Sequence, residues 1–268
     1  METKGEGKKA NISYDSFISS KPFEFVVGPK KRVFTIHSAL VASLSPVLER
    51  LVNGGLLVAK KRSVVWEHVD EPTFVRFSQY AYMKTYEYPL STNRSLTLDK
   101  LRPLALPSPS PLARSADPTG QSQQGQKGEM LWEKFSKQLS SSEPHVAMIP
   151  VPLISTDHLD DDAEFLLSHA RLHVFADRYG MKPLMRLSLS TLHYILVTVP
   201  EDNLTPGVVK LLQYCYQNET PAALKDLVVE YVVCRVETLW EKEGVAELAR
   251  VHGTFSSAVI KGLLGRIT

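Results

Sequence analysis

Two histidines and an aspartate are the strongest candidates for a chemical site in this sequence. His169, His173 and Asp177 are spaced four residues apart, so they lie on one face of a helix. A His-x3-His pair of this kind can bind a metal ion. No matching third or fourth ligand is evident, and we interpret the three residues as an exposed polar helix face. We therefore expect no metal and no other cofactor.

Other residues that could carry catalysis have simpler structural explanations. Asp160-Asp161-Asp162 could supply paired catalytic carboxylates, but the run precedes a predicted helix whose N-terminal partial positive charge it would stabilise. Cys215 and Cys234 lie in apolar helical patterns, and we interpret both as small buried hydrophobic residues in a reducing compartment. Nucleophile-elbow, P-loop and dinucleotide-binding motifs do not occur. The sequence therefore does not predict an enzyme.

Bulk properties exclude several classes of partner. The chain of 268 residues is 43% hydrophobic and has a formal net charge of +2, which favours a globular core and does not indicate nucleic-acid binding. There is neither a Cys/His zinc finger nor a basic recognition helix. The N-terminus lacks the apolar region of a signal peptide, and the longest apolar stretch is too short to span a bilayer. We expect a cytoplasmic or nuclear protein, or one in both compartments, with neither nucleic-acid nor membrane partners.

The elements that must position these residues begin with short strands. Residues 23–27 and 33–36 are rich in strand-forming side chains, and the Gly28-Pro29 break between them predicts a hairpin. Residues 63–66 predict a third strand.

Turn and cap residues predict the helices that lie between and after these strands. Ser38 can cap a first helix, and Ser45-Pro46 begins a second one that ends at Asn53-Gly54-Gly55. Asp70 opens a third helix, which Pro89 would end. The buried face predicted for this third helix consists of Phe74, Phe77 and Ala81.

The composition changes abruptly after residue 90. Residues 103–128 consist largely of Pro, Ser, Gln and Gly, with too few apolar side chains to offset the ordering entropy of a fold. We expect a mostly disordered insertion over residues 91–160, with one short amphipathic helix near residues 129–140. This helix could dock onto the rest of the chain or bind a groove on a partner. Its apolar face consists of Leu131, Trp132, Phe135 and Leu139.

Helical patterns dominate the remainder of the chain. Gly180, Pro200 and Asn218 act as helix stops. Strands early and helices late indicate an α+β fold rather than alternating βαβ units. The predicted helices cover residues 163–179, 183–197, 205–217, 221–241 and about 244–264.

Three separate motifs, in the correct order along the chain, resemble those of the BTB/POZ family. Residues 34–48, which include His37, are similar to the strand-to-helix signature of the family. Asp70 and Phe74 belong to a segment that resembles the central BTB helix, and Asp177 and Tyr179 belong to one that resembles a later BTB helix end. We expect His37 to tie the end of its strand to the following helix by a side-chain hydrogen bond. The amino-acid sequences of the motifs, together with the long insertion, resemble those of many BTB proteins of filamentous fungi.

The resemblance implies a BTB/POZ fold, a small β-sheet with helical hairpins, followed by a C-terminal helical extension. It also implies a protein–protein interaction module, for example a substrate adaptor of a cullin-3-type ubiquitin ligase. A self-associating scaffold or regulatory protein with no ligase role is the alternative. The expected segments are a disordered N-terminus (1–20), the N-terminal part of the BTB domain (21–90), the insertion (91–160), the C-terminal BTB helices (161–200) and the helical extension (201–268).

The loop after the second predicted helix differs from that of cullin-binding BTB domains. Such domains carry a hydrophobic residue followed, two positions later, by Glu. Here Leu56 matches the hydrophobic position, Val58 replaces the Glu, and a basic run follows over residues 60–62. We expect Leu56, Leu57 and Val58 to form an apolar triplet that either binds a partner or folds back onto the domain. Any binding to a cullin-3-type scaffold should therefore be weak.

BTB domains also dimerise, often by exchanging an N-terminal strand. Residues 12–17 are weakly apolar and could supply such a strand, but they contain no long hydrophobic run. We therefore expect a weak homodimer.

Overall fold

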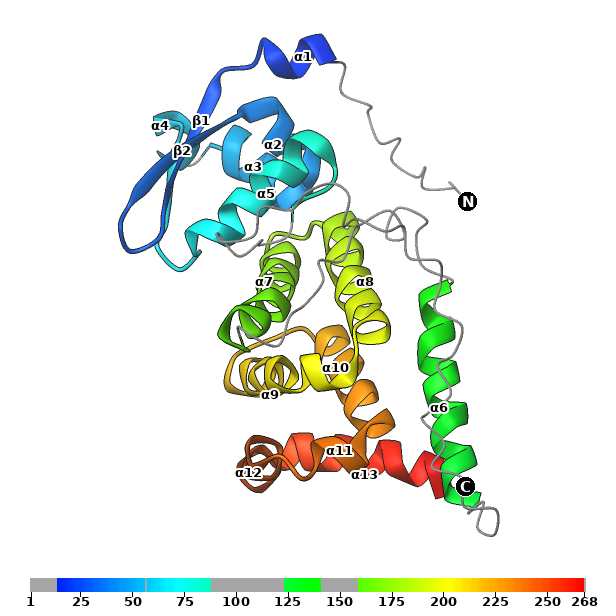
Figure 1. Ribbon diagram of the computed structural model, residues 1–268. Coiled ribbons are helices and arrows are strands. Elements are labelled where there is room, and N and C mark those ends of the chain that lie inside the picture. The colour runs from blue at the N-terminus through cyan, green and yellow to red at the C-terminus, as the bar shows by residue number, and fades with distance from the viewer. Residues whose placement is uncertain (1–13, 56, 88–122, 141–158, 268) are drawn as a thin grey trace, which may run out of the picture. The chain divides into compact units, whose positions relative to one another are not determined.

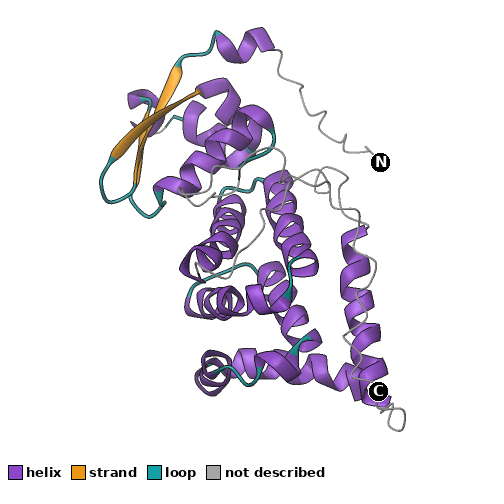
Figure 2. Cartoon of the chain, in the orientation of Figure 1, coloured by secondary structure: helices purple, strands orange, loops and turns teal. Residues whose placement is uncertain are grey.

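The computed structural model describes residues 14–55, 57–87, 123–140 and 159–267. The chain divides into two compact units. The N-terminal unit comprises Met1–Glu87 and Phe175–Lys182, and the helical unit comprises Tyr88–Val174 and Pro183–Thr268. The strands of the described residues all lie in the N-terminal unit (Figure 2). This arrangement of early strands and late helices confirms the predicted α+β order.

The sheet of the N-terminal unit has its first strand in the middle. β1 (Pro22–Val27) pairs antiparallel with β2 (Arg32–His37) and parallel with β3 (Ser63–Trp66). The predicted hairpin is confirmed, and Gly28 opens its turn at a φ of 71°, a left-handed conformation that favours glycine. One face of β1 is buried, because Phe23, Phe25 and Val27 alternate with more exposed residues.

Three helices connect β2 to the parallel strand β3. These are α2 (Ser38–Leu44), α3 (Pro46–Asn53) and α4 (Leu57–Lys61). Together with the later helix α5 (Glu71–Met83), α2 and α3 lie beside the hairpin (Figure 1). Ser45 caps α3 by accepting a hydrogen bond from the Leu48 backbone N–H at 3.1 Å, as predicted. Ser38 does not cap α2, because it is the first helical residue and His37 precedes it without a capping bond.

Helix α5 (Glu71–Met83) begins as predicted and ends early. Asp70 caps it by accepting a hydrogen bond from the Thr73 backbone N–H at 2.8 Å. The helix ends at Lys84, which has a φ of 59° and donates its backbone N–H to the carbonyl of Tyr80. This left-handed cap satisfies the terminal carbonyl, so the prediction that Pro89 ends the helix is wrong. The predicted buried face is confirmed at Phe74, Phe77 and Ala81.

The helical unit is built around α10 (Ala222–Cys234). This helix contacts α6 (Gln123–Ser140), α9 (Glu201–Gln217) and α13 (Gly253–Ile267) (Figure 1). The remaining helices of this part of the chain are α7 (Leu159–Arg178), which crosses from one unit to the other, α8 (Lys182–Thr198), α11 (Val236–Leu239) and α12 (Glu243–Val251).

Several predicted helix boundaries are wrong. The helix predicted over residues 221–241 is broken at Arg235, and the one near 244–264 is broken at His252. Helix α9 starts at Glu201 rather than at 205, with Pro206 inside it. Arg235 is not a strong helix breaker, so tertiary packing overrides local propensity at this break. At the second break, Gly253, a poor helix former, directly follows His252.

The predictions for the N-terminus and the insertion are tested only in part. Residues 1–13, 88–122 and 141–158 lie outside the described residues. The structure places a short helix, α1 (Tyr14–Ile18), where the sequence predicts disorder and a strand-forming segment, so both expectations are wrong for these residues. The helix predicted near 129–140 is confirmed and begins earlier, at Gln123.

Candidate functional site

The N-terminal unit closes around an aromatic cluster that the end of α7 completes. The ring centroid of Tyr179 lies 4.6 Å from that of Trp66 and 4.8 Å from that of Phe175. The Tyr179 carbonyl accepts a hydrogen bond from Ser45 Oγ at 2.6 Å. Ser45 therefore holds the start of α3 and the residues after α7 at the same time. Burial raises the pKa of Tyr179 to about 12.

Asp70 and Phe74 organise α5 against this cluster. Besides capping the helix, the Asp70 carboxylate accepts a hydrogen bond from Thr73 Oγ1 at 2.8 Å. The fully buried ring of Phe74 packs 5.2 Å from Phe25 and 6.0 Å from Trp66, centroid to centroid. Both residues are therefore structural parts of the N-terminal unit.

His37 differs from its predicted role, whereas Asp177 is exposed as expected. The Nδ1 atom of His37 is hydrogen-bonded to Tyr82 Oη at 2.9 Å. His37 thus ties the end of β2 to α5, and not to the helix that follows it in the chain. The side chain of Asp177 is exposed, and its backbone carbonyl accepts a hydrogen bond from the Gly180 N–H at 2.9 Å.

The predicted cullin-facing loop contains a short helix. Leu56 and the side chain of Leu57 lie outside the described part of the chain, and Val58 is half-buried in α4. Lys60 and Lys61 are exposed at the end of α4. Sequence analysis missed this helix, which has only five residues and no capping signal.

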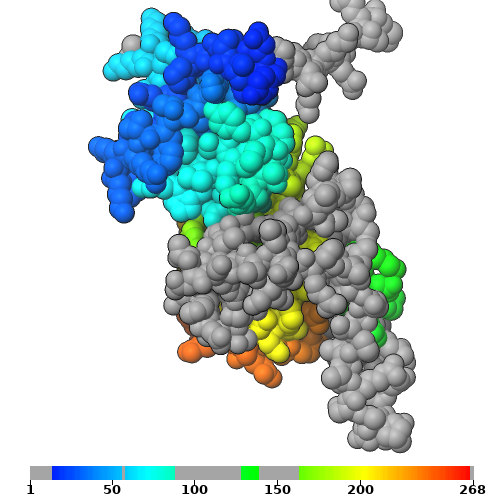
Figure 3. Space-filling view, turned by 45° about the horizontal axis from the view of Figure 1, so that its top comes forward, coloured from blue at the N-terminus to red at the C-terminus, as the bar shows by residue number. Residues whose placement is uncertain are grey.

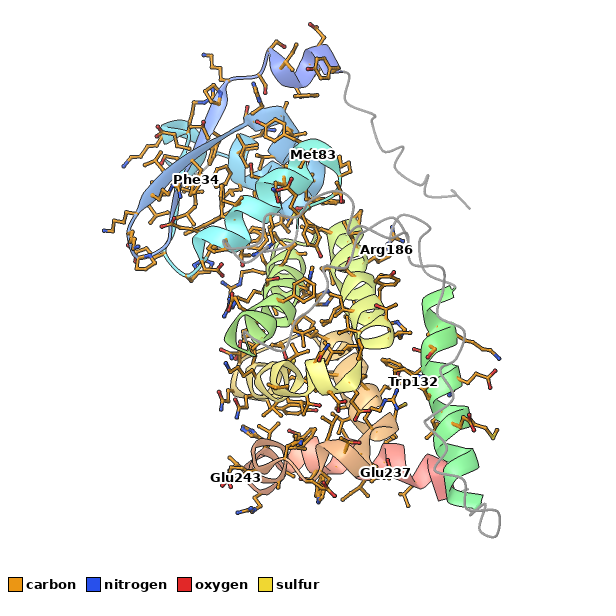
Figure 4. All side chains as sticks on the ribbon, in the orientation of Figure 1. Phe34, Met83, Trp132, Arg186, Glu237 and Glu243 are labelled. Atoms are coloured by element: carbon orange, nitrogen blue, oxygen red, sulfur yellow. The ribbon has the colours of Figure 1, made fainter. Side chains whose placement is uncertain are left out.

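Helix α6 docks onto the helical unit through its predicted apolar face. The ring of Phe135 is 2% exposed and lies 4.5 Å from the His193 ring and 6.0 Å from the Tyr231 ring. His193 Nε2 donates a hydrogen bond to the Phe135 carbonyl at 2.9 Å. Figure 4 shows Trp132 on the side of α6 that faces the neighbouring helices. The docking alternative is therefore confirmed for Trp132 and Phe135, whereas the side chain of Leu139 is not described.

An arginine and a glutamate complete the α6 contact. The guanidinium carbon of Arg235 lies 3.8 Å from the centroid of the Trp132 ring, a cation–π arrangement. Arg235 Nε also lies 3.4 Å from Glu201 Oε2. Sequence analysis missed both residues, because positions so far apart in the chain carry no pattern that links them.

The histidine row is buried, which corrects the prediction of an exposed polar face. His169 and His173 are 0% and 2% exposed, and His173 Nδ1 lies 3.0 Å from the Met185 carbonyl and 3.2 Å from Ser188 Oγ. Asp177, which belongs to the N-terminal unit, is exposed. Among the described residues, no group of three or more His, Cys, Asp or Glu side chains could hold a metal ion.

The two cysteines differ in burial. Cys215 is buried, as predicted, and burial raises the pKa of its thiol to about 12. Cys234 is only half-buried, so the prediction of two buried cysteines holds for the first one alone.

Comparison with known proteins assigns the chain to no family. No family model, curated protein or solved structure matches it. Within the described ranges, every helix is too short or too polar to cross a lipid bilayer.

Proposed function

We propose that this chain is a protein–protein interaction protein whose N-terminal unit is a BTB/POZ-type domain. The observation that carries the proposal is the return of residues 175–182 to the N-terminal unit. They bring the third BTB-like motif against the first, where the Tyr179 carbonyl accepts a hydrogen bond from Ser45. Phe175, just before the third motif, packs with its ring centroid 5.0 Å from that of Phe77 in the second. Motifs that meet in one core after a long separation in sequence support a common origin more strongly than motifs that match separately.

Within this proposal, the first partner to test is a cullin-3-type scaffold. The resemblance places the contact in the segment from Leu56 to Val58, where Leu56 supplies the hydrophobic anchor. Buried apolar anchors set dissociation rates, and rim charges tune association and partner choice. The exposed Lys60 and Lys61 reverse the rim charge of the family pattern, so we expect weak binding.

Calorimetric titration against the N-terminal domain of cullin-3 tests this role. Leu56→Glu should abolish binding, and Val58→Glu, which restores the family's acid, should strengthen it. Val65→Glu is the matched control, because Val65 is exposed on β3 and lies outside the loop. Tight binding that Leu56→Glu leaves unchanged would exclude this loop as the contact. No binding by any folded variant would favour the scaffold alternative.

A self-associating scaffold is favoured by a separate surface feature. Tyr14 and Ile18 of α1 are 72% and 45% exposed, and α1 lies at the surface of the N-terminal unit (Figure 3). Contiguous exposed apolar side chains mark contacts with other proteins, and these two lie one turn apart on α1. Sedimentation velocity at increasing concentration should show a weak dimer that Tyr14→Glu with Ile18→Glu removes. A wild-type chain that stays monomeric at high concentration would contradict this alternative.

A further inference from the structure

The contact between α6 and the rest of the helical unit has the composition of a binding interface rather than that of a domain core. Among the α6 side chains that the structure describes, Trp132 and Phe135 chiefly anchor the contact, and Glu133, Lys134 and Lys137 on the other faces are exposed. Two glycines, at positions 125 and 128, lie within α6. Glycine is unfavourable inside a helix, so this segment gains much of its helical order from the surface it binds.

The surface under α6 contacts both the side chains and the backbone of this helix. Arg235 covers the face of the Trp132 ring, and Tyr231 and the His193 ring contact Phe135. His193 Nε2 also donates to the Phe135 carbonyl. A Trp and a Phe at positions i and i+3 of a helix therefore fit this surface. The hydrogen bond from His193 of α8 to the Phe135 carbonyl of α6 fixes how closely the two helices pack.

Polar groups at the contact are not fully satisfied. Among the described residues, Glu201 Oε1 has no hydrogen-bond partner, and Arg235 Nε is near Glu201 Oε2 without donating to it. Burying polar groups that are only partly satisfied lowers the stability of a contact, so the α6 contact is weaker than one in which every polar group is paired.

We propose that the surface under α6, formed around His193, Tyr231 and Arg235, is a helix-binding groove that α6 occupies within the chain and that an amphipathic helix of a partner protein occupies by displacing it. The partner helix carries a Trp and, three residues later, a Phe or a similar large apolar residue. Tyr231 and His193 are almost fully buried under α6, so the groove requires an occupant and the two helices exchange. This proposal does not depend on the BTB assignment of the N-terminal unit.

Fluorescence polarisation with a labelled peptide of residues 123–140 tests the groove on the full chain. The peptide should bind the Trp132→Ala/Phe135→Ala variant, whose own helix no longer competes. It should bind the wild type more weakly by roughly tenfold or more, because a tethered competitor acts at an effective concentration on the order of millimolar. Met130→Ala with Lys134→Ala, on the exposed side of α6, is the matched control and should behave as the wild type.

Two further measurements identify the contact. Arg235→Gln, added to the opened variant, should weaken peptide binding several-fold, and a peptide with Ala at both aromatic positions should not bind. Circular dichroism establishes that each variant is folded. If the double variant does not fold, Phe135→Leu carries the test, with an affinity between those of the wild type and a fully open groove.

Three results would overturn the proposal. The first is a folded, opened variant that binds the peptide no more tightly than the wild type. The second is equal binding of the Ala-substituted peptide, which would mean that the aromatic pair is not recognised. The third is a concentration-dependent wild-type dimer that the Trp132→Ala/Phe135→Ala variant abolishes, since the occupant would then be α6 of a second copy.

Discussion

Removing the Tyr179 ring should destabilise the N-terminal unit by about 3–4 kcal/mol, within the range for aromatic-to-alanine changes in a core. The ring is 9% exposed and packs against Trp66 and Phe175. The bond from Ser45 Oγ goes to the Tyr179 backbone carbonyl, so Tyr179→Ala removes ring packing and leaves that bond in place. Tyr179→Phe keeps the ring and should cost less than about 1 kcal/mol.

Urea unfolding followed by Trp66 fluorescence measures this effect. The chain has two other tryptophans, Trp132 and Trp240, and replacing both with Phe makes Trp66 the reporter for the N-terminal unit. Asp177→Ala is the matched control, because its exposed side chain should change stability by no more than about 0.5 kcal/mol. An unchanged Trp66 transition in Tyr179→Ala would refute the reasoning, as would an equal loss in Asp177→Ala.

Three further predictions follow from single side chains. Ser45→Ala should lose about 1–2 kcal/mol of unfolding free energy in the same assay, because the α3 cap and the bond to Tyr179 both disappear; an unchanged value would contradict this. Burial lowers the pKa of His193 below its ordinary value, so the unfolded state takes up the proton first and stability should fall as pH drops below about 6.5. His193→Gln should flatten that part of the pH profile of thermal unfolding, and a variant profile parallel to the wild type would exclude His193 as its cause. A thiol reagent should modify Cys234 before Cys215, whose pKa burial raises to about 12; equal rates in the folded protein would show that Cys215 is accessible.

Local sequence signals predicted the elements of the N-terminal unit well, because each element begins or turns at a residue whose side chain or backbone favours that structure. Ser45-Pro46 and Asp70 place side-chain oxygens at helix starts, and the Gly28-Pro29 turn permits the hairpin. The pattern of Phe74 and Phe77 likewise identified the buried face of α5. These features depend on neighbours within a few residues, which a sequence shows directly.

The wrong predictions concern residues whose burial or backbone conformation depends on contacts with residues far away in the sequence. His169 and His173 read as a polar face, yet hydrogen bonding to α8 allows His173 to be buried. The break at Arg235 accompanies its contacts with Trp132 and Glu201, and neither partner is near it in sequence. For the candidate surfaces, the sequence predicted the apolar face of α6 correctly at Leu131, Trp132 and Phe135, but it could not identify the residues that receive this face.

The discontinuity of the N-terminal unit has a consequence for its synthesis. The 87 residues of Tyr88–Val174 separate its first part from Phe175–Lys182, and ribosomes add about 5–20 residues per second. Tyr179 lies 113 residues after Trp66, so for about 6–23 s Trp66 has been made but Tyr179 has not. During this interval the aromatic cluster is incomplete, and its exposed rings can associate with other chains. Lower growth temperatures or added chaperones should therefore raise the yield of soluble protein in a recombinant host.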